Sequence, residues 1–141
     1  MSDNSAPKPS ILSLFKTDRA SEEEGRWFPL GGPIQVQLRR FTSKKSAAVR
    51  DELYRPYKRP GKVDMKVPTE VDVDLTNQHL ARGVIVDWKG IYAEDGSEIP
   101  FTSDEAYKLL TELPDFAREI VMLAIDMDNF RAQTDAAIAK N

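Results

Sequence analysis

The chain has 141 residues, a formal net charge of -3, 40% hydrophobic and 30% charged residues, and no cysteine. This length gives room for one domain and a short arm, and the composition is typical of a soluble globular protein. The lack of cysteine excludes disulfides, thiol catalysis and cysteine zinc sites, and the apolar runs are far shorter than the roughly 20 residues that cross a bilayer.

Residues 1–24 are expected to form a flexible N-terminal arm. Prolines and serines dominate its start, and three consecutive glutamates lie at its end. An apolar cluster at 11–15 interrupts this polar segment, and such a cluster needs a groove on its own domain or on a partner. The members of this apolar docking cluster are Ile11, Leu12, Leu14 and Phe15.

A β-hairpin is predicted over about residues 26–41. The stretch at 26–30 favours a short strand, and the Gly31-Gly32-Pro33 sequence favours a tight turn. After the turn, apolar and polar side chains alternate, which is typical of a half-buried strand. The apolar members of this alternation are Ile34, Val36 and Leu38.

Two helices are predicted in the middle of the chain, at about 43–56 and 73–88. Thr42 or Ser43 can cap the first helix, and Pro56 should end it. Residues 71–75 alternate as in a strand, but the longer segment also has one apolar helical face, and its length favours a helix. This face consists of Leu75, Leu80, Val84 and Trp88.

The last third of the chain is predicted to contain a loop and two further helices. Trp88 is expected to be buried and to anchor the 90–101 loop, in which Asp95-Gly96 favours a turn. A capping box formed by Thr102 and Glu105 predicts a helix over about 102–112. Its buried face should include Leu113, and apolar residues repeated every three or four positions predict a final helix over about 115–138.

Together these elements predict a mainly α protein with a small N-terminal β-hairpin, in the α+β class. We expect a single compact helical domain over 25–141, preceded by the flexible arm over 1–24.

The sequence offers little for catalysis or metal binding. His79 is the only histidine, and a lone histidine without cysteines or a known ligand spacing is expected to be a surface or boundary residue. The acidic residues near Met127 lack the glycine and glutamate of a calcium loop. The sequence therefore predicts a non-enzymatic protein without cofactor or metal.

A basic block is the one strong feature of the charge distribution. Residues 39–62 hold 9 basic and 2 acidic side chains, net +7, whereas residues 63–141 hold 7 basic and 16 acidic, net -9. The block could pair with the acidic half, with a protein partner or with nucleic acid. Nucleic acid is the least favoured partner, because no recognised reading motif is present.

Several sequence stretches, spread over about residues 12–132, resemble small tail assembly chaperones of long-tailed phages. The most distinctive part runs from Asp87 to Leu110 and contains GVIVDWKGI followed by DGSEIPFTSDEAYKLL. The other similar stretches are SLFKTD, EEEGRWFPL, IQVQLRRFTSKKS, LYRPYKR and LAIDMDNFRA.

This resemblance implies a protein that holds the tape measure protein, and also tail tube subunits, until the tail tube polymerises. It implies activity in the host cell cytoplasm during phage assembly, without membrane insertion, and it is compatible with self-association. The alternative function is a permanent structural subunit of the virion, in the tail or neck. From the residues, the expected partner surface combines the arm with the final helix, through Ile11, Leu12, Leu14, Phe15, Arg118, Glu119 and Arg131.

Overall fold

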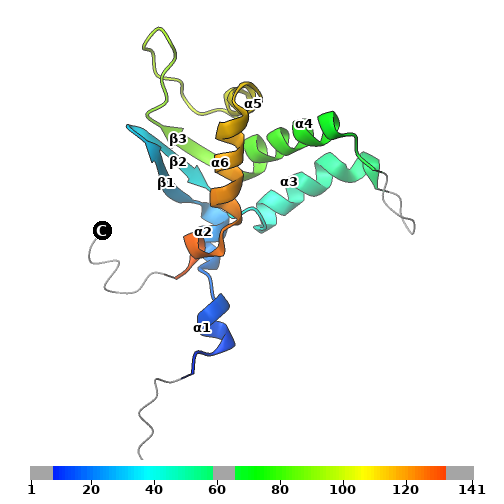
Figure 1. The fold of residues 1–141 in the computed structure, drawn as a ribbon, viewed down its shortest axis with the longest axis vertical. Coiled ribbons are helices and arrows are strands. Elements are labelled where there is room, and N and C mark those ends of the chain that lie inside the picture. Colours follow the sequence, from blue (N-terminus) through cyan, green and yellow to red (C-terminus); the bar gives the residue numbers. More distant parts are fainter. Residues whose placement is uncertain (1–7, 59–65, 133–141) are drawn as a thin grey trace, which may run out of the picture.

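The computed structural model describes residues 8–58 and 66–132, which form a small sheet flanked by helices (Figure 1). Its helices are α1 (Ile11–Phe15), α2 (Arg19–Glu24), α3 (Lys44–Tyr54), α4 (Thr69–His79), α5 (Ser103–Glu112) and α6 (Pro114–Ile125). Two single 3-10 turns, η1 (Arg55–Tyr57) and η3 (Met127–Phe130), and one π turn, η2 (Leu80–Val84), extend them. The strands are β1 (Arg26–Gly31), β2 (Ile34–Leu38) and β3 (Ile85–Lys89). This architecture confirms the predicted α+β class.

The sheet contains the predicted hairpin and one further strand. β1 pairs with β2, and β2 pairs with β3, all antiparallel, in the order β1-β2-β3. Phe28, Val36 and Trp88 lie side by side across the three strands. Val36 and Leu38 are fully buried, which confirms the alternation predicted for this strand.

The helix predicted over 73–88 is wrong at both ends. α4 begins at Thr69, and after His79 the chain makes one π turn and enters β3. The open edge of β2 supplies hydrogen-bond partners for this strand, and the β-branched pair Ile85 and Val86 suits a strand. The apolar residues of the expected helical face are nevertheless buried: Leu75, Leu80, Val84 and Trp88.

The helix predicted over 115–138 is too long at its C-terminal end. α6 ends at Ile125, and the carboxylate of Asp126 accepts a hydrogen bond from the amide of Asp128 at 2.9 Å, which caps η3. An aspartate side chain that bonds to a nearby amide competes with helix continuation. Phe130 is thereby buried against the Phe28 ring. Residues 133–138 lie outside the described part of the chain.

The core lies between the sheet and helices α4, α5 and α6. Its fully buried members include Leu80, Leu110 and Ile120. The predicted caps are confirmed, because the hydroxyls of Ser43 and Thr102 accept backbone amides at the starts of α3 and α5. The predicted burial of Leu113 is wrong: half of this side chain is exposed, because α5 ends just before it at Glu112.

The second half of the expected flexible arm is attached to the domain. The amide of Asp18 donates to the carbonyl of Phe130 at 2.7 Å, and Glu22 forms an ion pair with Arg40 at 2.7 Å. The carboxylate of Glu23 accepts the amide of Lys44 at 2.6 Å, at the start of α3. The acidic run at the end of the arm thus binds the domain, which the sequence pattern did not indicate.

Candidate protein-binding surfaces

The four apolar residues of the arm lie together on helix α1, and all are exposed. Ile11 and Leu12 are 70% and 72% exposed, and Leu14 and Phe15 are 45% and 60% exposed. At about 100° per residue, their directions span about 160° of the helix surface. Ser10 caps the helix by accepting the Ser13 amide. α1 therefore presents one broad apolar face. Figure 1 shows the helix α1 extending away from the sheet and the other helices.

The chain directly after α1 is bonded to the domain. Thr17 forms a β-bridge with Arg131, and Asp18 bonds to Phe130 as described above. Lys16 is thus the single residue between α1 and the anchored Thr17. The position of α1 relative to the domain is restricted by this short connection.

The structure does not bring the seven expected partner residues into one surface. Arg131 lies beside Thr17, next to α1, and pairs with Asp128 at 2.6 Å. Arg118 and Glu119 lie on α6 and line two different hollows. Of the three charged residues expected in the partner surface, only Arg131 therefore lies near the apolar face of α1.

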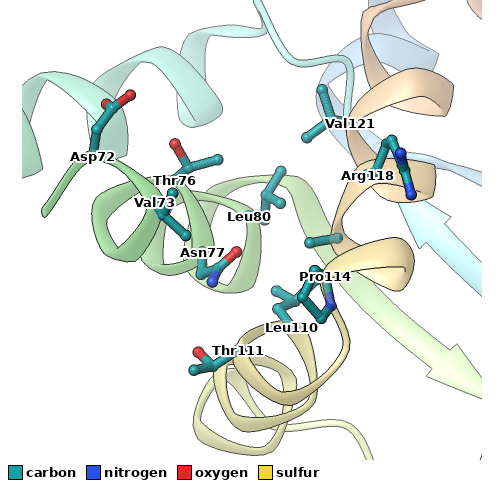
Figure 2. Close-up of a pocket in the computed structure, with 11 residues that line it drawn as sticks. Asp72, Val73, Thr76, Asn77, Leu80, Leu110, Thr111, Pro114, Arg118 and Val121 are labelled. Atoms are coloured by element: carbon teal, nitrogen blue, oxygen red, sulfur yellow. The ribbon is translucent and has the colours of Figure 1, made fainter. Parts of the chain in front are cut away.

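The first hollow, here called the helical hollow, has a volume of about 260 Å³ and lies between α4, α5 and α6 (Figure 2). Figure 2 shows Val73 and Thr76 on the α4 side and Leu110 and Pro114 on the opposite side. Arg118 lies at its rim and pairs with Asp115. The helical hollow combines an apolar floor with a polar rim, which suits a reversible contact.

The second hollow, here called the hairpin hollow, has a volume of about 500 Å³. It lies between the β1–β2 turn, the 90–101 loop and the adjoining ends of α5 and α6. Its lining is mainly apolar, with two carboxylates and no basic side chain among the described residues. The lining residues are Leu30, Ile34, Ile91, Tyr92, Ile99, Leu109, Leu113, Asp115, Phe116 and Glu119.

Several exposed apolar residues were missed by the sequence reasoning. Tyr92 and Leu113 are 55% and 50% exposed at the hairpin hollow, and Met122 and Ile125 are exposed on α6. The position of Leu113 directly before Pro114 was a usable indication, because proline starts a new helix there. Nothing in the local pattern marks Tyr92, since the hollow is built from segments far apart in sequence.

His79 is a core residue, and its predicted surface or boundary position is wrong. It is 1% exposed, its Nε2 lies 2.7 Å from the Ser46 hydroxyl, and its ring packs edge-on against Phe41. Burial, and then the positive charge of Arg50, lower its pKa from 6.5 to about 4. A neutral, hydrogen-bonded imidazole of this kind joins α3 to α4 and is a structural group.

This environment predicts a pH-dependent stability. The folded protein keeps His79 neutral down to about pH 4, whereas the unfolded chain binds a proton below about 6.5. The contribution of neutral His79 to the free energy of unfolding is therefore complete above pH 6.5. It falls by on the order of 2 kcal/mol as the pH falls towards 4. Urea unfolding of the wild type and of His79→Gln at pH 7.5 and 5 measures it. An equal pH effect in both proteins would contradict the assignment.

Two cations of the basic block form ion pairs with nearby carboxylates within the described residues. Arg40 pairs with Glu22 of α2, and Lys58 pairs with Asp51 of the block itself, at 3.6 Å. The Arg39 guanidinium donates to the Glu23 carbonyl at 2.8 Å. For Arg40 and Lys58, the paired carboxylates therefore lie outside the acidic half of the chain, at Glu22 and Asp51. Arg59 and Lys62 lie outside the described residues.

No helix in the described ranges is both long and apolar enough to cross a membrane. Within the same ranges, the structure brings no three histidine or acidic side chains together in a way that could hold a metal ion.

Comparison with known proteins identifies one family. The model of the YdaY prophage protein family matches residues 41–141. No curated protein and no solved structure matches the chain. The matched span begins after β2, so it includes the chain from α3 onwards and leaves out α1, α2, β1 and β2.

Proposed function

Since the chain belongs to the YdaY prophage protein family, we propose that this phage protein acts by binding other proteins, as a non-enzymatic chaperone of tail assembly. Its clients would be the tape measure protein and tail tube subunits. It would act in the host cytoplasm before the tube polymerises.

The observation that carries this proposal is the exposed apolar face of α1. Four large apolar side chains on a five-residue helix are exposed to water. Only Lys16 lies between this helix and Thr17, which is bonded to the domain. A lasting exposure of this kind favours aggregation, so a partner is expected to cover it. A short helix with one apolar face suits a groove or helical stripe of another protein.

The tape measure protein is proposed as the client because of the resemblance to tail assembly chaperones. Long helical clients expose apolar stripes before assembly, and binding to them needs an amphipathic surface and no active site. The sole histidine, His79, lines neither hollow and packs against Ser46 and Phe41 instead. This arrangement supports a binding role.

Changing the four apolar residues of α1 to serine is expected to lower client recovery at least ten-fold. The reason is that the change removes the apolar contact area and leaves the buried core untouched. The assay is co-expression with the tape measure protein of the same phage, followed by affinity pull-down and measurement of the soluble client.

The matched control is the double variant Met122→Ser and Ile125→Ser, which changes exposed apolar residues on α6 that line neither hollow. This control should recover the client as the wild type does. Undiminished binding by the α1 variant would place the client surface elsewhere. Presence of the protein in purified virions at fixed copy number would favour a structural subunit over a chaperone.

A further inference from the structure

Two complementary surfaces lie at opposite ends of the molecule, and each lacks a partner within the described residues. One is the apolar face of α1, and the other is the hairpin hollow. Figure 1 shows α1 at one end of the longest axis and the 90–101 loop at the other. We infer that α1 of one copy docks in the hairpin hollow of a second copy, in a head-to-tail contact. This inference goes beyond the proposed function, because it concerns copies of this chain and holds for any client.

The two surfaces match in polarity and in charge. The hollow has an apolar lining with the carboxylates of Asp115 and Glu119, and Glu119 forms no ion pair among the described residues. The apolar residues of α1 lie between Lys8 and Lys16, both exposed. Asp115 is already paired with Arg118, so the Glu119 carboxylate is the acidic group that a lysine of α1 meets in this apolar hollow, and this complementarity orients the contact.

The α1 helix cannot reach the hairpin hollow of its own chain. The anchored Thr17 lies beside Arg131, beyond the C-terminal end of α6, whereas the hollow is lined by residues at the N-terminal end of α6. The 12 residues of α6 are about 18 Å long. A five-residue helix with a one-residue connection reaches roughly 11 Å from Thr17. The occupant therefore comes from a second molecule.

A head-to-tail contact leaves one α1 and one hollow free at the two ends of each dimer. Such an interface continues into an open chain or closes into a ring, unlike a two-fold dimer. The area of a five-residue helix is small compared with a standard interface of about 1,600 Å², so the association is reversible. A client that binds α1 more tightly then displaces the second copy, which keeps the apolar face covered until the client arrives.

Two purified variants test the inference by complementation. The first carries serine at the four apolar α1 positions and keeps its hollow. The second carries Tyr92→Lys and Leu113→Lys, which block the hollow at two exposed positions and keep α1. Light scattering at up to about 1 mM chain, where weak association is populated, should give the mass of one chain for each variant alone. An equimolar mixture should give twice the 15.9 kDa of one chain, while the wild type exceeds this mass.

Circular dichroism of each variant checks that the domain is folded. If the hollow variant does not fold, the single variants Glu119→Lys and Lys16→Glu take the place of the first two variants. Each single variant should self-associate more weakly than the wild type, and an equimolar mixture of the two should restore the association. A wild type that stays at the mass of one chain overturns the inference. The inference is also overturned if the hollow variant self-associates as strongly as the wild type, since α1 would then contact another α1. A mixture without a two-fold mass increase has the same consequence.

Discussion

Replacing Trp88 by alanine is expected to lower the free energy of unfolding by about 3–5 kcal/mol, which is the usual cost of removing a large buried aromatic side chain. Trp88 is 4% exposed and packs edge-on against Phe101, with 5.2 Å between the ring centroids. Its indole N–H donates to the Ile99 carbonyl at 2.7 Å. The side chain thus connects β3 to the end of the 90–101 loop, and its predicted burial and anchoring of this loop are confirmed.

The second tryptophan is the matched control. Trp27 is 39% exposed, and its ring lies 4.3 Å from the Lys89 ammonium group. Trp27→Ala removes this cation–π contact and a partly exposed ring, so it should cost less than Trp88→Ala, about 1–2 kcal/mol. Urea unfolding followed by circular dichroism measures both variants without relying on tryptophan fluorescence. Equal costs for the two substitutions would show that Trp88 does not hold the loop.

Gly90→Ala is expected to destabilise the protein by about 3 kcal/mol or more, because two costs add at this position. Gly90 has a φ of 78°, which costs an L-residue about 1–2 kcal/mol. A β-carbon there would overlap the carbonyl oxygen of Pro33 and lie 2.5 Å from its carbonyl carbon. Both obstacles are backbone atoms of Pro33, directly before β2. Relief of the clash therefore requires a shift of the β2–β3 pairing.

Gly96→Ala separates the two costs. Gly96 has a φ of 88° and no heavy atom within 4 Å of the position of an added β-carbon. Its substitution should therefore cost only the backbone term, about 1–2 kcal/mol. The comparison is made by thermal and urea unfolding of the two single variants. A Gly90 variant as stable as the Gly96 variant would indicate that β2 and β3 separate easily at this end of the sheet.

The sequence by itself determined the features that depend on neighbouring residues. Ser43 and Thr102 cap α3 and α5 as predicted, because a hydroxyl at this position satisfies a free amide one turn later. The β1–β2 hairpin followed from period-two alternation and a glycine-containing turn. The four apolar residues of α1 were also identified as one cluster, because they lie within five consecutive residues.

The tertiary structure decided the features that depend on distant partners. Residues 85–88 suit a helix face or a strand equally well, and the unpaired edge of β2 selected the strand. His79 is buried because Ser46 and Phe41, more than 30 positions away, supply a hydroxyl and an aromatic face. The hairpin hollow likewise combines a turn, a loop and two helix ends. Local patterns report hydrogen bonding and polarity within a few residues, whereas burial and pairing follow from which segments meet in the folded chain.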